Sequence, residues 1–382
     1  MTRKHLVRTA LAVSAAGILA LTACSGGNAT DNGDDGTGAS SGESVTINSV
    51  TMIQPNTPSA PILEWFYTQL EERSDGRITV DRTAPESICK APEIAECVRD
   101  GRADLGSSIS DYSASLFPSM SVAGIPFMVD NPQALMSALY EVNTSNESAV
   151  AQWENMGIEY IAGWSPGTTI IGANKEVNSI DDLKGLQLRA IGSSLPKAYE
   201  AVGASVVSMP AAETYENIER GVADAVSWTL DGPVDYKLME QISNWADPGV
   251  GAYTTFALWM NKDFYDGLPD DLRQIVDEVR DELNGGAAME QFNAKTEDQC
   301  TALIEFPNTK GLSAWDPKAT AEWKDLVQDD LIAAYIEQAE ADGLDDAQGY
   351  FDAYVSALET AASSSTQVDD PVAVCIERFA ER

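Results

Sequence analysis

Histidine, the side chain that enzymes use most often as a general base, occurs once in these 382 residues, as His5. Residues 1–23 are expected to be removed as an export signal, so the mature chain would contain no histidine. It could then form neither a Ser-His-Asp nor a Cys-His catalytic centre, and it would lack the commonest zinc ligand. The sequence also has no P-loop motif, and no acidic pair stands out among its 60 Asp and Glu residues. We therefore predict that the protein is not an enzyme and uses no cofactor or metal, with a secreted hydrolase using paired carboxylates as a distant alternative.

Four cysteines follow Cys24, and they form the second group of reactive side chains. An even number of cysteines in an exported protein favours disulfides, and four cysteines allow three connectivities. Cys89 and Cys97 flank the start of a helical stretch, whereas Cys300 and Cys375 both lie in the C-terminal part. We expect the pairs Cys89–Cys97 and Cys300–Cys375, with free buried thiols as the alternative.

The N-terminus has the features of an export signal with a lipid attachment site. A basic start precedes an apolar run over residues 11–21, which is too short to span a membrane. The run leads into Leu-Thr-Ala-Cys24, which resembles a lipobox, the motif at which signal peptidase cuts before a lipidated cysteine. Residues 1–23 are thus predicted to be a lipoprotein signal peptide. A plain secretory signal with a chance cysteine is the alternative.

Residues 24–44 carry the lipidated cysteine followed by small and polar residues, so they are expected to form a flexible tether. No other stretch of about 18 apolar residues occurs, so the lipid is the only membrane attachment that we predict. The formal net charge of −36 would repel phosphate backbones, which argues against a nucleic-acid partner. The expected location is extracytoplasmic, anchored to the cell membrane by the N-terminal lipid.

Strand-like and helix-like segments alternate from Val45 onward, in a chain long enough for two lobes. Such alternation is typical of an α/β protein built from βαβ units, in which ligands bind at the carboxyl ends of the strands. Residues 270–304 are expected to form a long helical stretch, and the tail from Thr320 is expected to be largely helical. The expected strands are near 45–53, 77–80, 103–106, 186–190, 204–209 and 223–226, and the expected helices between them are near 61–74, 92–99, 194–202 and 211–220.

An ordered set of short motifs between Val45 and Ile304 carries a resemblance to a known family. Each motif is weak alone, but their order and nearly constant spacing make the set specific. The motifs are Phe117-Pro118, Ile125-Pro126-Phe127, the run Ile180–Arg189 (IDDLKGLQLR), Val202-Gly203-Ala204, Met209-Pro210, Glu213-Thr214-Tyr215, Gly221-Val222-Ala223-Asp224, Met260-Asn261-Lys262 and Leu268-Pro269. With them the sequence resembles the extracytoplasmic solute-binding subunits of tripartite ATP-independent periplasmic (TRAP) transporters, the DctP-type family.

The resemblance implies a two-lobed, periplasmic-binding-protein-like α/β fold with a ligand cleft between the lobes. The chain would cross between the lobes near Pro166 and Tyr253. Lobe 1 would comprise 45–166 with about 254–293, and lobe 2 would comprise 167–253 with about 294–382. The implied function is to capture a small organic acid and deliver it to the membrane subunits of a TRAP permease. A binding lipoprotein for an ABC importer and a receptor for a sensor kinase are the alternatives.

Arg189 is the ligand-binding residue that the resemblance indicates most strongly. It ends the element D-L-K-G-x-x-x-R, where family members carry an arginine that forms a two-pronged salt bridge with the ligand carboxylate. The planar, always charged guanidinium matches a carboxylate in shape and charge. Without the motif, a solvated arginine at a strand end would be the ordinary interpretation.

Trp228 falls where many family members place an asparagine that binds the ligand and where others, including keto-acid binders, have a tryptophan. An indole offers a flat apolar wall and one hydrogen-bond donor. A core tryptophan at the end of a buried strand is the alternative. Metal-using members have an acidic residue at the preceding position, which is Ser227 here, and this difference argues against a bound cation.

Thr169 stands where dicarboxylate and sialic-acid binders often carry a second arginine. With one arginine in the cleft, a monocarboxylate with an apolar or flat body is the expected ligand. Asp111 would repel an anion and is expected to be structural or to pair with an amine of the ligand. Five further residues are expected to line the cleft through hydroxyl groups or aromatic rings: Ser110, Tyr112, Trp164, Thr168 and Tyr253.

Overall fold

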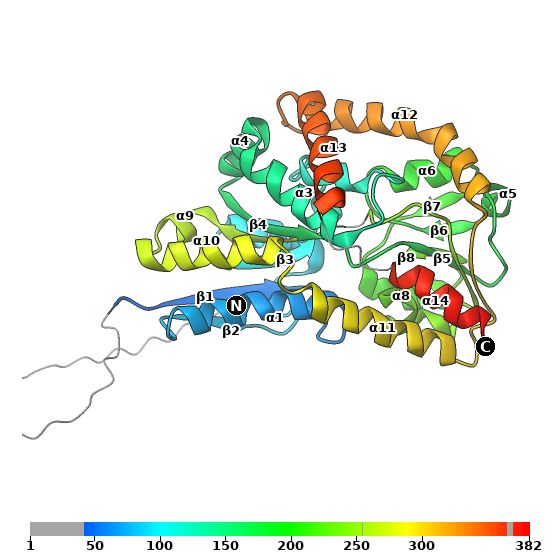
Figure 1. Cartoon of the computed structure of the whole chain (residues 1–382), viewed down its shortest axis with the longest axis horizontal. Coiled ribbons are helices and arrows are strands. Elements are labelled where there is room, and N and C mark those ends of the chain that lie inside the picture. The colour runs from blue at the N-terminus through cyan, green and yellow to red at the C-terminus, as the bar shows by residue number, and fades with distance from the viewer. Residues whose placement is uncertain (1–41, 254, 365–369) are drawn as a thin grey trace, which may run out of the picture. The chain divides into compact units, whose positions relative to one another are not determined.

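Two β-sheets organise the part of the chain that the computed structural model describes, residues 42–253, 255–364 and 370–382 (Figure 1). Helices follow most strands in chain order and pack beside the sheets. The α/β class predicted from the alternating segments is therefore confirmed. The expected signal at 1–23 and the expected lipidation site Cys24 lie outside the described residues.

The first sheet has the strand order β2-β1-β3-β10-β4. β1, β2 and β3 are parallel, whereas β10 runs antiparallel to both of its neighbours. Every residue of β3 is buried, as expected for a central strand that is covered on both faces. The bounds are β1 Val45–Thr51, β2 Ile78–Arg82, β3 Leu105–Ile109, β4 Ile158–Trp164 and β10 Phe256–Asn261.

The second sheet has the strand order β11-β9-β5-β8-β6-β7. β6 pairs in parallel with β7 on one side and with β8 on the other, so it is an inner strand of this sheet. β5 runs antiparallel to β8 and β9. The bounds are β5 Ile170–Ala173, β6 Gln187–Arg189, β7 Ser205–Val207, β8 Ala225–Trp228, β9 Asn244–Asp247 and β11 Gly311–Ala314.

The helices beside the first sheet show their start and stop signals in the sequence. Asn131 accepts hydrogen bonds from two backbone N–H groups at the start of α3, where Pro132 takes the first helical position. Gly157 ends α4 in the left-handed conformation, at φ 68°. The bounds are α1 Ser59–Arg73, α2 Ile94–Arg99, α3 Pro132–Ser145, α4 Glu147–Met156, α9 Lys262–Asp266 and α10 Asp270–Asn284.

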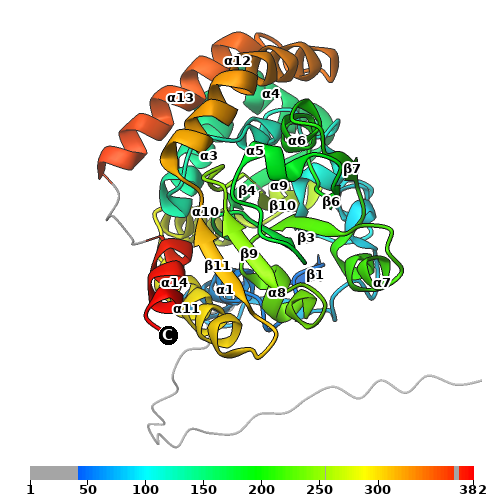
Figure 2. The ribbon, with the colours of Figure 1, turned by 90° about the vertical axis from the view of Figure 1, so that its right-hand side faces the viewer.

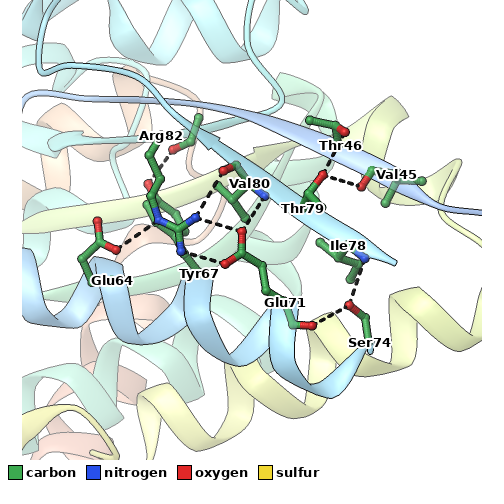
Figure 3. Close-up of polar contacts among 11 residues, drawn as sticks. Val45, Thr46, Glu64, Tyr67, Glu71, Ser74, Ile78, Thr79, Val80 and Arg82 are labelled. Atoms are coloured by element: carbon green, nitrogen blue, oxygen red, sulfur yellow. Dashed lines mark hydrogen bonds and ion pairs between the residues drawn. The ribbon is translucent and has the colours of Figure 1, made fainter. Parts of the chain in front are cut away.

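Polar contacts fix α1 against the edge strand β2 (Figure 3). The Arg82 guanidinium donates to both carboxylate oxygens of Glu71, at 2.8 and 2.9 Å, and to Glu64 at 3.1 Å. Glu71 also accepts the backbone N–H of Val80 at 3.0 Å. The helix therefore holds both the backbone and a side chain of this strand, and a two-pronged arginine pair gives the contact a defined geometry.

The chain passes between the two sheets more than once. Residues 165–169 connect β4 of the first sheet to β5 of the second, and residues 248–255 connect β9 back to β10. These connections contain Pro166 and Tyr253, the expected crossing points. A third passage runs from β10 through α10 and α11 (Met289–Glu305) to β11. The two glycines 285 and 286 divide the long helical stretch expected at 270–304, and Gly286 has φ +98°, which favours glycine.

Further helices pack beside the second sheet and form the C-terminal tail (Figure 2). α12 connects the two sheets. Near its start, Trp323 is buried in the core of the second sheet, and farther along, Tyr335 donates to the carbonyl of Pro118 on the side of the first sheet. α13 then packs on α3, so this part of 294–382 lies with the first sheet, whereas the sequence interpretation places it in lobe 2. The bounds are α5 Ile180–Leu183, α6 Leu195–Ala201, α7 Thr214–Glu219, α8 Asp231–Asp235, α12 Pro317–Ala341, α13 Ala347–Ser364 and α14 Pro371–Ala380.

The structure contains both predicted disulfides. Cys89 and Cys97, eight residues apart, have their Cα atoms 6.5 Å from each other, and Cys97 lies on α2. Cys300 on α11 bonds to Cys375 on α14 with a Cα–Cα distance of 5.4 Å. The second disulfide ties the C-terminal helix to a helix that also contacts α1 and α8.

Candidate functional site

A narrow cavity lies where strands of both sheets end. Ile109 ends β3, Pro166 follows β4, and Arg189 and Trp228 end β6 and β8. This is the position at which open α/β sheets bind their ligands. The cavity volume is about 20 Å³, which holds about one water molecule, so the lining side chains nearly fill the site in this conformation.

Arg189 reaches the cavity because β6 is an inner strand of the second sheet. The strand pairs Arg189 with Val207 of β7 and with Val226 of β8. The arginine is only 2% exposed, which is rare for this residue type. A charged side chain is thus held inside the protein at the carboxyl end of a parallel strand.

Neutral groups surround the Arg189 guanidinium. Its Nε and Nη2 donate to the backbone carbonyl of Met209, at 3.3 and 3.1 Å. Its central carbon lies 3.9 Å from the centre of the Trp228 ring, a cation–π geometry. The Tyr112 hydroxyl is also near, since the positive charge of Arg189 acts to lower the pKa of this tyrosine. No carboxylate of the described residues forms an ion pair with Arg189.

Trp228 forms a wall of the cavity. It is 8% exposed, and its ring centre lies 5.1 Å from that of Tyr236. A Cβ atom on Gly232 would lie 2.4 Å from the Trp228 ring, so only glycine allows α8 to approach the indole this closely. The Trp228 side chain lies close enough to Asp231 to lower the pKa of its carboxyl, so this carboxylate competes with a ligand for the indole donor.

Asp231 is a cavity residue that the sequence reasoning missed. It begins α8 and is 4% exposed. Burial raises the pKa of its carboxyl to about 6, although hydrogen bonds from Thr229 and Trp228 act in the opposite direction. The signal was its place three residues after Trp228, just beyond the carboxyl end of an expected strand. Tyr236 and Phe256 also line the cavity and were also missed.

A chain of hydroxyl groups supports the cavity wall from behind. Tyr199 donates to the Ser227 hydroxyl at 3.0 Å, and that hydroxyl lies 3.1 Å from the Tyr253 hydroxyl. Tyr253 and Ser227 both line the cavity. Tyr253 lies in the connection between β9 and β10, so these hydroxyl contacts also join that connection to β8, the strand that carries Trp228.

The other four expected lining residues have different surroundings. The Tyr112 hydroxyl accepts the backbone N–H of Ala211, a cavity residue, at 3.0 Å and lies near Arg189, so it borders the site. Ser110, Trp164 and Thr168 are not among the described residues that line the cavity. Two of them have a polar partner elsewhere, since Ser110 donates to Thr255 and Trp164 donates to Ser59. Trp164 also stacks behind the cavity residue Phe256, with ring centres 5.9 Å apart.

Asp111 is a second buried carboxyl close to the cavity but outside its lining. Both of its oxygens are buried and have no hydrogen-bond partner among the described residues. The carboxylate packs against Gly192, where an added Cβ would lie 3.4 Å from it. Asp111 follows β3 of the first sheet, whereas Gly192 follows β6 of the second sheet. The Asp111 carboxyl is therefore enclosed by a loop of the other sheet. Burial raises the pKa of Asp111 to about 7.

Replacing Asp111 with asparagine is expected to stabilise the protein at pH 8 by up to about 4 kcal/mol. The folded protein holds the Asp111 proton more tightly than the unfolded chain, whose carboxyl has a pKa near 3.8. This contribution to stability is present in acid and is lost as the pH rises through about 7. Chemical unfolding of both proteins at pH 4 and pH 8 measures the effect. An Asp111→Asn protein no more stable than wild type at pH 8 would contradict it.

Comparison with known proteins identifies the family. A model of the bacterial extracellular solute-binding proteins, family 7 (DctP), matches residues 49–338. The chain belongs to this family. The resemblance predicted from the motifs is thereby confirmed, and the match extends past Ile304, where the motifs end, into α12. A relative, the C4-dicarboxylate-binding periplasmic protein DctP of Rhodobacter capsulatus, is 24% identical over 293 residues, which cover 76% of this chain and 83% of the relative.

Solved structures share the fold of this DctP-family chain. A TRAP solute-binding protein from Rhodoferax ferrireducens, in complex with copurified benzoate, has a TM-score of 0.74 at 21% identity and covers 85% of this chain and 100% of its own. A TRAP periplasmic solute-binding protein from Bordetella bronchiseptica, with bound (R)- and (S)-mandelate, has a TM-score of 0.69 at 23% identity and covers 83% and 99%. The predicted two-lobed periplasmic-binding-protein fold is therefore confirmed.

The comparisons also bear on the location and class of the protein. The family is extracellular, and its relatives are solute-binding proteins rather than enzymes. In the described parts of the chain, no helix combines the length and apolarity that a membrane span needs. No cluster of three or more His, Cys, Asp or Glu side chains there could hold a metal ion.

Proposed function

We propose that this protein captures a small monocarboxylic acid outside the cell membrane and delivers it to the membrane subunits of a TRAP transporter. The observation that carries the proposal is the buried Arg189 guanidinium, which faces the cavity without a carboxylate partner among the described residues. A buried charge is costly unless an opposite charge pairs with it. A ligand carboxylate supplies that charge, and its two oxygens match the donor fork of arginine.

The remaining walls favour a ligand with an apolar or flat body. Trp228, Phe256, Ile109 and Ile191 contribute apolar surface around the guanidinium. Thr169, at the position of the second arginine in dicarboxylate binders, is buried and neutral, so it offers no partner for a second carboxylate. Benzoate and mandelate, found in two similar structures, have this monocarboxylate chemistry.

Ligand capture by closure of the two lobes fits the distribution of the site. The proposed lobes are 45–166 with about 254–293 and α13, and 167–253 with the rest of about 294–382. Arg189 and Trp228 would come from the second lobe and Ile109 and Phe256 from the first. We assign ligand contact to Arg189, Trp228, Tyr253 and Tyr112, and a supporting role to Ser110, Trp164 and Thr168.

A thermal-shift screen of the mature protein against small acids, neutral solutes and amines tests this function. Monocarboxylates should raise the melting temperature most, because they alone complete the charge balance at Arg189. Stabilisation by neutral sugars or by dicarboxylates, with no effect of monocarboxylates, would contradict the proposal. The absence of turnover with the best ligand would support a binding protein that is not an enzyme. An ABC-importer operon around the gene would favour the alternative transporter class.

Lipid attachment at Cys24 is the proposed means of retention at the membrane. Replacing Cys24 with serine is expected to move the protein from the membrane fraction to the soluble fraction, since a lipid on this thiol supplies the membrane affinity. Cell fractionation followed by immunoblotting measures the distribution. Ser25→Ala, next to the modified residue, serves as the control and should stay with the membrane. A Cys24→Ser protein that also stays there would rule out the anchor.

A further inference from the structure

Two opposite charges line the same cavity without pairing with each other. Arg189 is 2% exposed and Asp231 is 4% exposed, and no ion pair joins them. Arg189 ends β6, whereas Asp231 begins α8, after β8. Both residues lie close to Trp228, because the guanidinium covers its ring face and the Asp231 carboxylate is near its side chain. The cavity therefore has a cationic side and an anionic side.

The described partners of Asp231 leave room for another donor. Its carboxylate accepts from the Thr229 hydroxyl, and the Trp228 side chain and its own backbone N–H are the other donors close to it. A carboxylate has about four lone-pair sites. None of these three donors carries a positive charge, so the buried anion lacks a counter-charge, and its raised pKa is consistent with that.

We propose that Asp231 binds a hydrogen-bond donor of the ligand, so that the preferred ligand is a monocarboxylate that also carries an ammonium or hydroxyl group. The inference rests on the proposed function, since it assumes that Arg189 holds the ligand carboxylate. An ammonium would then balance Asp231 as the carboxylate balances Arg189, and it should be favoured over a hydroxyl. Asp111 is not the partner, because it does not line the cavity.

Three acids that share a benzoate core and differ only in the group at position 3 test this specificity: benzoate, 3-hydroxybenzoate and 3-(aminomethyl)benzoate. Calorimetric titration of the mature wild-type protein should give an affinity for 3-(aminomethyl)benzoate at least about tenfold higher than for benzoate, with 3-hydroxybenzoate between them. Asp231→Asn keeps the size of the side chain and an acceptor for Thr229 and Trp228. It should remove most of the preference for the amine, so that the ratio of the two affinities falls toward one.

Asp235→Asn is the matched control, because Asp235 lies on the same helix but bonds to Asn56 and Gln299 instead of lining the cavity. It should keep the wild-type ratio of affinities. If wild type binds benzoate as tightly as its amine derivative, the role of Asp231 is wrong and the proposed function stands. If none of the three acids nor any other monocarboxylate binds, the proposed function fails and this inference fails with it. The wild-type ratio decides the question even if Asp231→Asn does not fold.

Discussion

Replacing Arg189 with alanine is expected to weaken monocarboxylate binding by about 2–5 kcal/mol, roughly 30- to 4000-fold. The substitution leaves the ligand carboxylate facing Met209, whose carbonyl accepts hydrogen bonds from Arg189 and offers nothing to an anion. The apolar walls around it exclude the water that would otherwise solvate the charge. Calorimetric titration with the best acid from the screen measures the loss.

Two further variants separate charge from packing at this site. Arg189→Lys keeps the charge but loses the planar fork, so binding should still be severely weakened. Trp228→Ala should reduce affinity less, because it removes a packing wall rather than a charge partner. Arg220→Ala is the control, since Arg220 is exposed and pairs with Glu216 on the surface. An Arg189→Ala protein that binds like wild type would refute the site assignment.

Removing the Cys300–Cys375 disulfide is expected to lower the free energy of unfolding by about 2–4 kcal/mol. The bond closes a loop of 75 residues, so it restricts the unfolded chain strongly. It also holds α14 on α11, where Arg378 donates to Thr301 at 2.9 Å. The double variant Cys300→Ala, Cys375→Ala should therefore unfold at lower urea concentration than wild type.

The short-range disulfide, between Cys89 and Cys97, provides the comparison. Cys89–Cys97 closes only eight residues, so its removal should cost less in the chain-entropy model. An equal loss of unfolding free energy in the double variant Cys89→Ala, Cys97→Ala and in the Cys300→Ala, Cys375→Ala variant would contradict that account. Mass mapping of the exported protein without reduction should find no free thiol among these four cysteines, and four alkylatable thiols would show that neither bond forms.

Alternation and motif order were enough to predict the α/β class and the family, and the number and positions of the cysteines predicted the two disulfides. Alternation and motif order also placed Arg189 at a strand end, and the structure puts that end at the cavity. The reason is that parallel strands end at a common edge, so a strand-end position specifies a place in space. The position of α13 on α3 was not predictable, because the tail carries no motif and many helical faces could accept its apolar residues.

The direction in which side chains point was the main feature of the site that the sequence did not predict. Ser110 and Trp164 do lie near strand ends, but their polar atoms point to Thr255 and Ser59, which are distant in sequence. Asp231 was missed for a different reason. Among 60 acidic residues, its place three residues after Trp228 was a weak signal until the fold buried it in the same cavity as Arg189.

A crystal structure of the mature protein with its best monocarboxylate tests the central claim most directly. We predict that both carboxylate oxygens accept hydrogen bonds from the Arg189 guanidinium and that the body of the ligand lies against Trp228. The arginine would then exchange at least one of its bonds to the Met209 carbonyl for the ligand. A ligand bound elsewhere, with Arg189 still held by Met209 and Trp228, would contradict the account.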